Sequence, residues 1–140
     1  MMKKYELMNE TITIKDGTVL HRIKALTSFG NVVKGDLGGW IEKEDNLSHN
    51  GTAWVYDNAK VYGNARVYDN AKVYDNACVY NKARLCDDTK VYDDACVGGM
   101  ACVGSKAKVY GNAKVYANAC ILDGHIIGKV FLSSEDIFQH

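Results

Sequence analysis

The sequence contains no proline, and its 17 lysines and arginines are balanced by 17 aspartates and glutamates. Zero formal net charge excludes the broad basic field of a general nucleic-acid binder or of a protein that adheres to anionic membranes. No apolar run approaches the length needed to cross a bilayer, and no apolar signal segment follows the two lysines near the start. We therefore expect a cytoplasmic protein without a membrane partner.

Metal-binding and disulfide patterns are also lacking. The cysteines are odd in number and show neither C-x-x-C nor Cys/His spacing: Cys78, Cys86, Cys96, Cys102 and Cys120. Free thiols in a reducing compartment fit this usage better than a disulfide framework. Some turn acids carry oxygen ligands that suit a divalent cation, but turn propensity accounts for them: Asp69, Asp87, Asp88 and Asp123. We predict no metal and no cofactor.

What the chain does contain is a repeat of six residues. An aliphatic residue recurs at every sixth position: Val55, Val61, Val67, Val73, Val79, Leu85, Val91, Val97, Val103, Val109, Val115, Ile121 and Ile127. Two positions before each of these, up to Ile121, stands an alanine, with Thr89 as the exception. Such self-similarity at a fixed period is typical of a solenoid.

Each hexad, such as A-K-V-Y-D-N from Ala71 to Asn76, predicts one short strand and one corner. Alanine and valine lie two apart and so point to the same side of a strand. The final Asp-Asn or Gly-Asn pair suits a sharp turn with left-handed backbone. Three sides close a coil of eighteen residues that stacks on the next at roughly 4.8 Å. The aliphatic series makes a little over four coils.

This pattern resembles the hexapeptide-repeat superfamily, in which a large aliphatic residue, small or polar residues and a small residue alternate. The resemblance covers about half the chain and implies a left-handed winding and assembly into trimers. The segment G-D-L-G-G-W-I, from Gly35 to Ile41, is also similar to the front end of small bacterial and phage hexapeptide-repeat proteins. We therefore expect an all-β fold, a triangular left-handed parallel β-helix of about four coils.

Caps are expected at both ends, since the terminal coils of a solenoid otherwise expose their core. Residues 1–50 contain two alternating strands within 11–26, joined by Asp16-Gly17 as a hairpin, and Trp40 and Trp54 are expected to cover the first coil. Residues 51–130 form the β-helix. Residues 131–140 form a C-terminal cap or tail, in which 133–138 are expected to begin a short helix. The three segments make one structural domain.

Residues eighteen apart become vertical neighbours, so the outward side chains form columns on three faces. The first face carries a tyrosine column and a lysine column: Tyr56, Tyr74, Tyr92 and Tyr110, with Lys72, Lys90 and Lys108. The second face carries Lys60, Cys78, Cys96 and Lys114 beside Tyr62, Tyr80, Gly98 and Tyr116. The third face carries Arg66, Arg84, Cys102 and Cys120 beside Tyr68, Cys86, Gly104 and Leu122.

Two interpretations of the first face stay open. Stacked aromatic pairs stabilise a sheet, by about 0.2 to 1 kcal/mol each. Alternatively the face binds a partner, because tyrosine is favoured at interfaces and stacked lysines repel one another unless acids neutralise them. The corner residues Asp57, Asp75 and Asp93 are the candidates for that neutralisation.

We predict a non-catalytic binding or scaffold protein, a homotrimer, that recognises a protein partner or a small anionic ligand. The candidate binding residues are Tyr56, Tyr74, Tyr92, Tyr110, Lys72, Lys90, Lys108, Arg66 and Arg84. Bases stack on tyrosine and phosphates meet lysine or arginine. Together with the phage-like front end, this chemistry suggests the hypothesis that the chain is phage-encoded and sequesters a nucleotide signal, an anti-defence role.

Enzyme alternatives have weaker support. The resemblance implies either acyltransferases, which use a histidine base and coenzyme A, or carbonic anhydrases, which hold zinc with three histidines. No histidine occurs between Gly51 and Gly124, so the zinc enzyme is excluded. An acyltransferase would depend on His125 or His49, which flank the coils and are more typical of capping or surface histidines.

Overall fold

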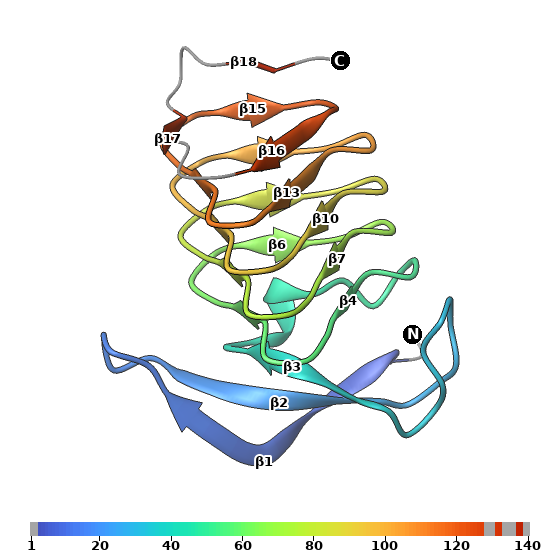
Figure 1. Cartoon of the computed structure of the whole chain (residues 1–140). Helices are drawn as coiled ribbons and strands as arrows, with labels where there is room; N and C mark the ends of the chain where they lie inside the picture. The colour runs from blue at the N-terminus through green and yellow to red at the C-terminus, as the bar shows by residue number, and fades with distance from the viewer. Residues whose placement is uncertain (1–2, 128–130, 133–136, 139–140) are drawn as a thin grey trace.

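The computed structural model describes residues 3–127, 131–132 and 137–138, with side chains up to Gly124. These residues form an all-β solenoid of stacked coils, standing on an N-terminal hairpin (Figure 1). The strands of the regular coils are short: β4 (Trp54–Val55), β5 (Lys60–Val61), β6 (Arg66–Val67), β7 (Lys72–Val73), β8 (Cys78–Val79), β9 (Arg84–Leu85), β10 (Lys90–Val91), β11 (Cys96–Val97), β12 (Cys102–Val103), β13 (Lys108–Tyr110), β14 (Lys114–Val115) and β15 (Cys120–Ile121).

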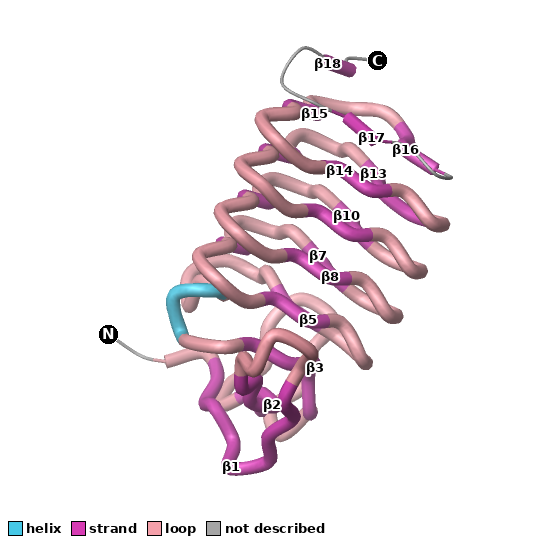
Figure 2. The backbone as a smooth tube through the Cα atoms, turned by 90° about the vertical axis from the view of Figure 1, so that its left-hand side faces the viewer, coloured by secondary structure: helices cyan, strands magenta, loops and turns pink. Residues whose placement is uncertain are grey.

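Three parallel sheets form the walls of the solenoid. The first face is the sheet β16-β13-β10-β7-β4, and the third is β18-β15-β12-β9-β6. The second face runs β3-β5-β8-β11-β14-β17 and is extended by β2 and β1. Pairing joins residues eighteen apart, as Val91 pairs with Val73, so the predicted columns are confirmed. Figure 2 shows the rungs of the second face stacked in successive tiers.

The interior is built from the alanine and aliphatic columns. From Ala53 to Ile121 every member of both columns is at most 1% exposed. Alanine leaves room at the crowded centre while valine fills the rest, as the close packing of protein interiors requires. Thr89 replaces one alanine, and its buried Oγ1 has no hydrogen-bond partner among the described residues.

The corners adopt left-handed backbone at their first residue, as at Asp57 (φ 56°) and Asp75 (φ 57°). The amide of the following alanine closes each turn: Ala59 N donates to Tyr56 O at 3.0 Å. Corner aspartates also link coils, because Asp57 Oδ2 accepts the amide hydrogen of Asp75 at 3.3 Å. The expected turn chemistry is therefore confirmed.

The N-terminal cap is an antiparallel hairpin of β1 (Tyr5–Thr13) and β2 (Val19–Ala25). Its turn contains Asp16 and Gly17 as expected: Gly17 has φ 90°, and the Asp16 carboxylate accepts the amide hydrogen of Thr18 at 2.9 Å. Strand β1 begins earlier than the sequence pattern predicts. Both tryptophans are buried at this end, Trp40 under Arg22 and Trp54 between the rings of Tyr5 and Phe29.

Below the regular repeats lies one further coil that the six-residue period does not show. Strand β3 (Leu37–Ile41) pairs in parallel with β5, and Leu47 forms a parallel bridge to Val67. Between them the short 3-10 helix η1 (Glu44–Asn46) replaces a corner. Gly39 stands at the position that alanine occupies in the regular coils. A Cβ at Gly39 would lie 2.6 Å from the Ala59 carbonyl oxygen, which is too close, so this position needs glycine.

The last coil departs from the predicted register. Strand β16 (His125–Ile127) pairs with β13 so that Ile126, not Ile127, lies beside Val109. The shift arises because the hexad after Ile121 is one residue short. Strand β17 (Phe131–Leu132) and β18 (Ile137–Phe138) keep the shifted register. The expected helix is thus wrong at 137–138, which continue the third sheet, and its residues 133–136 lie outside the described residues.

Lys4 closes the open end of the solenoid. Higher up, alanine carbonyls accept amide hydrogens from the coil below, as Ala71 O does from Trp54 N at 3.2 Å. Ala53 O instead accepts from Lys4 Nζ at 2.7 Å, and the Lys4 residue is 4% exposed. Burial lowers the pKa of Lys4 to about 8. The neutral amine still donates to Ala53 O, so deprotonation removes the cost of a buried charge without losing this contact.

We expect the free energy of unfolding of the wild type, relative to Lys4→Met, to rise between pH 8 and pH 9.5. The unfolded lysine keeps its proton to higher pH than the folded one, so unfolding takes up a proton across this window and stability increases with pH. The slope reaches at most about 1.4 kcal/mol per pH unit. Urea titrations at several pH values measure it. The exposed Lys3→Met variant is the control, and parallel curves for the wild type and Lys4→Met would contradict the assignment.

Candidate functional site: outward columns and the Arg66 groove

The tyrosine column of the first face is a continuous stack. The rings of Tyr74 and Tyr92 lie 4.8 Å apart at 3°, and those of Tyr92 and Tyr110 lie 4.9 Å apart at 1°. Tyr56 meets Tyr74 edge-on at 6.2 Å. The predicted alignment of these four tyrosines in one column is therefore confirmed. Because stacked rings cover one another's faces, the column presents ring edges and hydroxyls, and a base could insert between them only by separating the rings.

The lysines beside this stack lie on adjacent rungs, Lys90 pairing with both Lys72 and Lys108. The corner aspartates, the candidates for neutralising these lysines, form no ion pair with them among the described residues. Those carboxylates accept backbone amide hydrogens from the next coil, Asp75 Oδ2 from Asp93 at 3.2 Å and Asp93 Oδ2 from Gly111 at 3.0 Å. In the part of the chain that the structure describes, the ion pairs of lysine and arginine lie elsewhere: Lys3–Glu44 and Arg22–Glu10.

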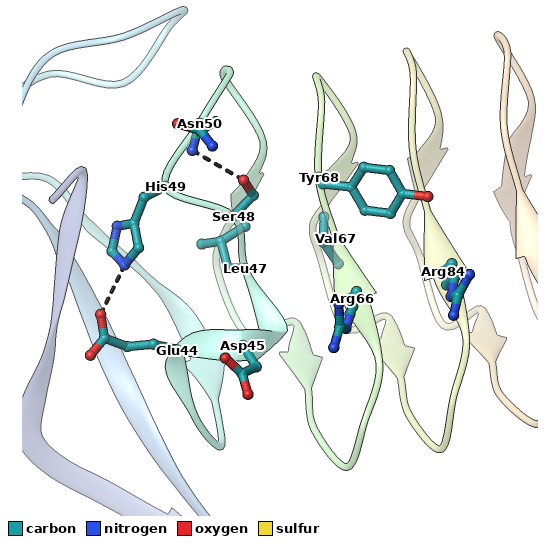
Figure 3. A pocket seen from close by; sticks show the side chains of 10 residues that line it. All are labelled: Glu44, Asp45, Leu47, Ser48, His49, Asn50, Arg66, Val67, Tyr68 and Arg84. Carbon is teal, nitrogen blue, oxygen red and sulfur yellow. Dashed lines mark hydrogen bonds and ion pairs between the residues drawn. The ribbon is translucent and has the colours of Figure 1, made fainter. Parts of the chain in front are cut away.

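A groove opens on the third face where the irregular first coil meets the regular ones (Figure 3). It has a volume of about 460 Å³, and its lining is Glu44, Asp45, Leu47, Ser48, His49, Asn50, Arg66, Val67, Tyr68 and Arg84. Arg66 and Arg84 are paired neighbours, and both are exposed. Neither guanidinium has a hydrogen bond or ion pair with a described residue. The groove thus offers two adjacent cationic forks for an anion.

Sequence reasoning selected Arg66 and Arg84 as binding residues and His49 as a candidate base, but it did not bring them together and missed the other residues of the groove. Tyr68 comes from the strand end beside Arg66, whereas the other wall consists of η1 and the segment that joins it to the first regular coil. The available signal was the spacing of eight residues between Leu47 and Val55, where a hexad would give six. An insertion of two residues displaces the corner and opens space beside the next rung.

His49 stands at the edge of this groove with both ring nitrogens engaged. Nδ1 accepts the backbone amide hydrogen of Lys4 at 3.1 Å, so the ring hydrogen lies on Nε2, which donates to Glu44 Oε1 at 2.8 Å. The ring stacks on Tyr5 at 4.2 Å. The hydrogen bond from His49 lowers the pKa of the Glu44 carboxyl. In this arrangement His49 has no free lone pair for a general-base role.

His125, the other candidate base, lies on the first face, where its backbone pairs with Lys108 of β13. Its side chain lies outside the described residues. The structure therefore does not bring His125 and His49 together: one belongs to the last coil and the other to the first.

The five cysteines are free thiols, and four of them stand in two vertical pairs, Cys78 with Cys96 and Cys102 with Cys120, while Cys86 lies outside both. The first pair interacts strongly. A hydrogen bond from the Cys78 thiol, aided by Lys114, lowers the pKa of Cys96 to about 7. The same hydrogen bond, followed by burial, raises the pKa of Cys78 well above its usual range.

One cluster has oxygen and sulfur atoms close enough for a cation: Asp69, Cys86 and Asp87, within 4.8 Å of one another. Its carboxylates already have structural partners. Asp69 Oδ2 accepts the amide hydrogen of Asp87 at 3.1 Å, and Asp87 Oδ2 accepts that of Ser105 at 2.9 Å. These contacts repeat the corner ladder of the first face and account for the acids.

The fold and its repeat define the class: the chain is a hexapeptide-repeat β-solenoid. Residues 59–73 match the family model of the YdcK β-solenoid repeat. The chain is also 38% identical over 63 residues to a protein of Escherichia coli (strain K12) called uncharacterized acetyltransferase YdcK. That similarity covers 40% of this chain and 19% of the relative, so the chain spans a small part of the relative's length. No helix among the described residues is long and apolar enough to span a membrane.

We expect Tyr92→Ala to lower the free energy of unfolding by about 1 to 3 kcal/mol, because it removes two stacked pairs, each worth about 0.5 to 1.5 kcal/mol. Tyr92→Phe keeps both rings and is the matched control, with an expected change below about 0.5 kcal/mol. Urea unfolding followed by circular dichroism measures both. Equal stability of Tyr92→Ala and the wild type would remove the structural role of the stack and favour a binding role.

Proposed function

We propose that this chain is a non-catalytic binding protein that recognises an anionic group, on a partner protein or on a small ligand such as a nucleotide, in the groove of Arg66 and Arg84. The observation that carries the proposal is the pair of adjacent exposed guanidiniums without a carboxylate partner among the described residues. Like charges on neighbouring rungs repel, so an incoming anion relieves a cost already present in the free protein.

The surroundings of the two arginines support an oriented ligand. Tyr68, Ser48 and Asn50 line the same groove and add hydroxyl and amide groups that donate to phosphate or carboxylate oxygens. Figure 3 shows the Tyr68 ring extending from its strand toward the rung of Arg84. Glu44 and Asp45 on the opposite wall favour a ligand that also carries hydrogen-bond donors, such as a base or a peptide backbone.

The lysines and tyrosine edges of the first face form a second contact surface in this proposal. Lys72, Lys90, Tyr56 and Tyr74 line a shallow depression of about 280 Å³. Assembly into a homotrimer through such faces, a cytoplasmic location consistent with free thiols, and sequestration of a nucleotide signal by a phage-encoded chain remain parts of the proposal. They rest on the chemistry of these columns and on the sequence resemblance.

Titration calorimetry with pyrophosphate and with a glutamate-rich peptide tests the groove. We expect at least one probe to bind the wild type, and the R66Q/R84Q variant to bind it roughly 100-fold more weakly, since each charge-assisted contact contributes about 1.5 to 3 kcal/mol. The matched control K15Q/K24Q removes two exposed lysines of the hairpin, which belong to neither contact surface of the proposal, and should bind within about twofold of the wild type. Binding of neither probe, or an equal loss in both variants, would overturn the groove assignment.

An acetyltransferase is the alternative, favoured by the name of the Escherichia coli relative. Against it stands His49, whose ring nitrogens are both engaged. We expect coenzyme A and acetyl-coenzyme A to leave the melting temperature unchanged, and hydrolysis or transfer of the acetyl group to match that of the His125→Ala control. A melting shift together with turnover that His125→Ala abolishes would favour the enzyme.

A further inference from the structure

The second face carries a pair of thiols between two cations, on a different wall of the solenoid from the Arg66 groove. Cys78 pairs directly with Cys96 on the next rung, and both side chains are half-buried. The rung below carries Lys60 and the rung above carries Lys114, each paired in the same column. These four positions are therefore direct vertical neighbours in one column of the sheet.

The geometry of parallel strands suits a cation held between the two sulfurs. Side chains at paired positions leave the sheet in the same direction, one strand spacing of roughly 4.8 Å apart. A disulfide needs its sulfurs within about 2.05 Å and its side chains turned toward one another. A linear sulfur–metal–sulfur unit with bonds of roughly 2.3 Å matches the spacing of the two strands, and the side chains can stay parallel.

We propose that Cys78 and Cys96 form a two-coordinate site for one soft monovalent cation of the Cu(I) class, flanked by Lys60 and Lys114. Thiolate ligands select such cations over hard ones. Binding breaks two S–H bonds, forms two metal–sulfur bonds and releases two protons to water, with no change of oxidation state. The product, two thiolates and one monovalent cation, carries one negative charge, which the two ammonium groups offset.

The tyrosine column of the second face runs beside the thiols, two residues further along each strand. The ring of Tyr80 occupies the space above Gly98, where a Cβ would lie 2.5 Å from the ring. Gly98 stands two residues from Cys96, so its missing side chain lets the ring lie beside the thiols. Tyr80 also stacks on Tyr62 at 5.6 Å. A partly shielded site excludes competing water ligands from a two-coordinate cation.

The second thiol pair provides an internal comparison. Cys102 pairs with Cys120 at the same spacing, but the column holds a cation on one side only, Arg84. The rung on the other side is that of Ile137, which has no charge. Cys102 is also exposed. The first pair should therefore bind the cation more tightly than the second.

Titration with Ag(I), a redox-stable probe of this class, tests the site in the full chain. In the C86S/C102S/C120S background, which retains Cys78 and Cys96, native mass spectrometry should show one ion per chain. Adding Cys78→Ser should weaken binding at least 100-fold, measured by competition with a chromophoric chelator. The C78S/C86S/C96S variant, which retains the second pair, should bind at least tenfold more weakly than the first background.

K60Q/K114Q leaves every thiol in place and should weaken binding at least threefold, so the site is tested even if a serine variant folds poorly. Circular dichroism melts report folding for each variant. Absence of the ion in the first background, equal affinity after Cys78→Ser, or equal affinity of the two pairs would overturn the proposal.

Discussion

The stacking of one coil on the next is the constraint on which the rest of this structure depends. Each rung donates and accepts backbone hydrogen bonds with the rungs above and below, so the core positions of successive coils must stay aligned, and residues gained or lost by a coil fall in its corners. A hexad that is one residue short therefore shifts every later rung, as Ile126 beside Val109 shows. The same constraint turns a sequence repeat into vertical columns of one residue type.

The regular coils could be predicted because local and long-range requirements coincide there. The alanine and valine positions, the left-handed corners and the stack of Tyr74 on Tyr92 all follow from a period of six and the chemistry of each position. No distant segment has to be known to place them. The hairpin turn at Asp16-Gly17 is equally local.

The first coil and the groove were not predictable in the same way. Strand β3 reaches its place through pairing with β5, and η1 stands where a corner would be. Asn46 holds this region: its buried side chain accepts the amide hydrogens of Glu42 and Lys43 and donates to the carbonyls of Gly63 and Ala65. A side chain that replaces backbone hydrogen bonds leaves no periodic trace in the sequence. The position of Lys4, whose side chain donates to the otherwise unpaired carbonyl of Ala53, could not be predicted for the same reason.

A solenoid of identical coils would extend one charge along a whole face, and the repulsion between rungs would grow with every coil. This chain interrupts its basic columns after one to three rungs: two cysteines separate Lys60 from Lys114, and cysteines follow Arg84 on the third face. Short columns keep the repulsion small while leaving compact cationic patches of different shape on each face. Recognition in such a fold is therefore expected at these patches and where the repeat is broken, since there one coil differs from the next.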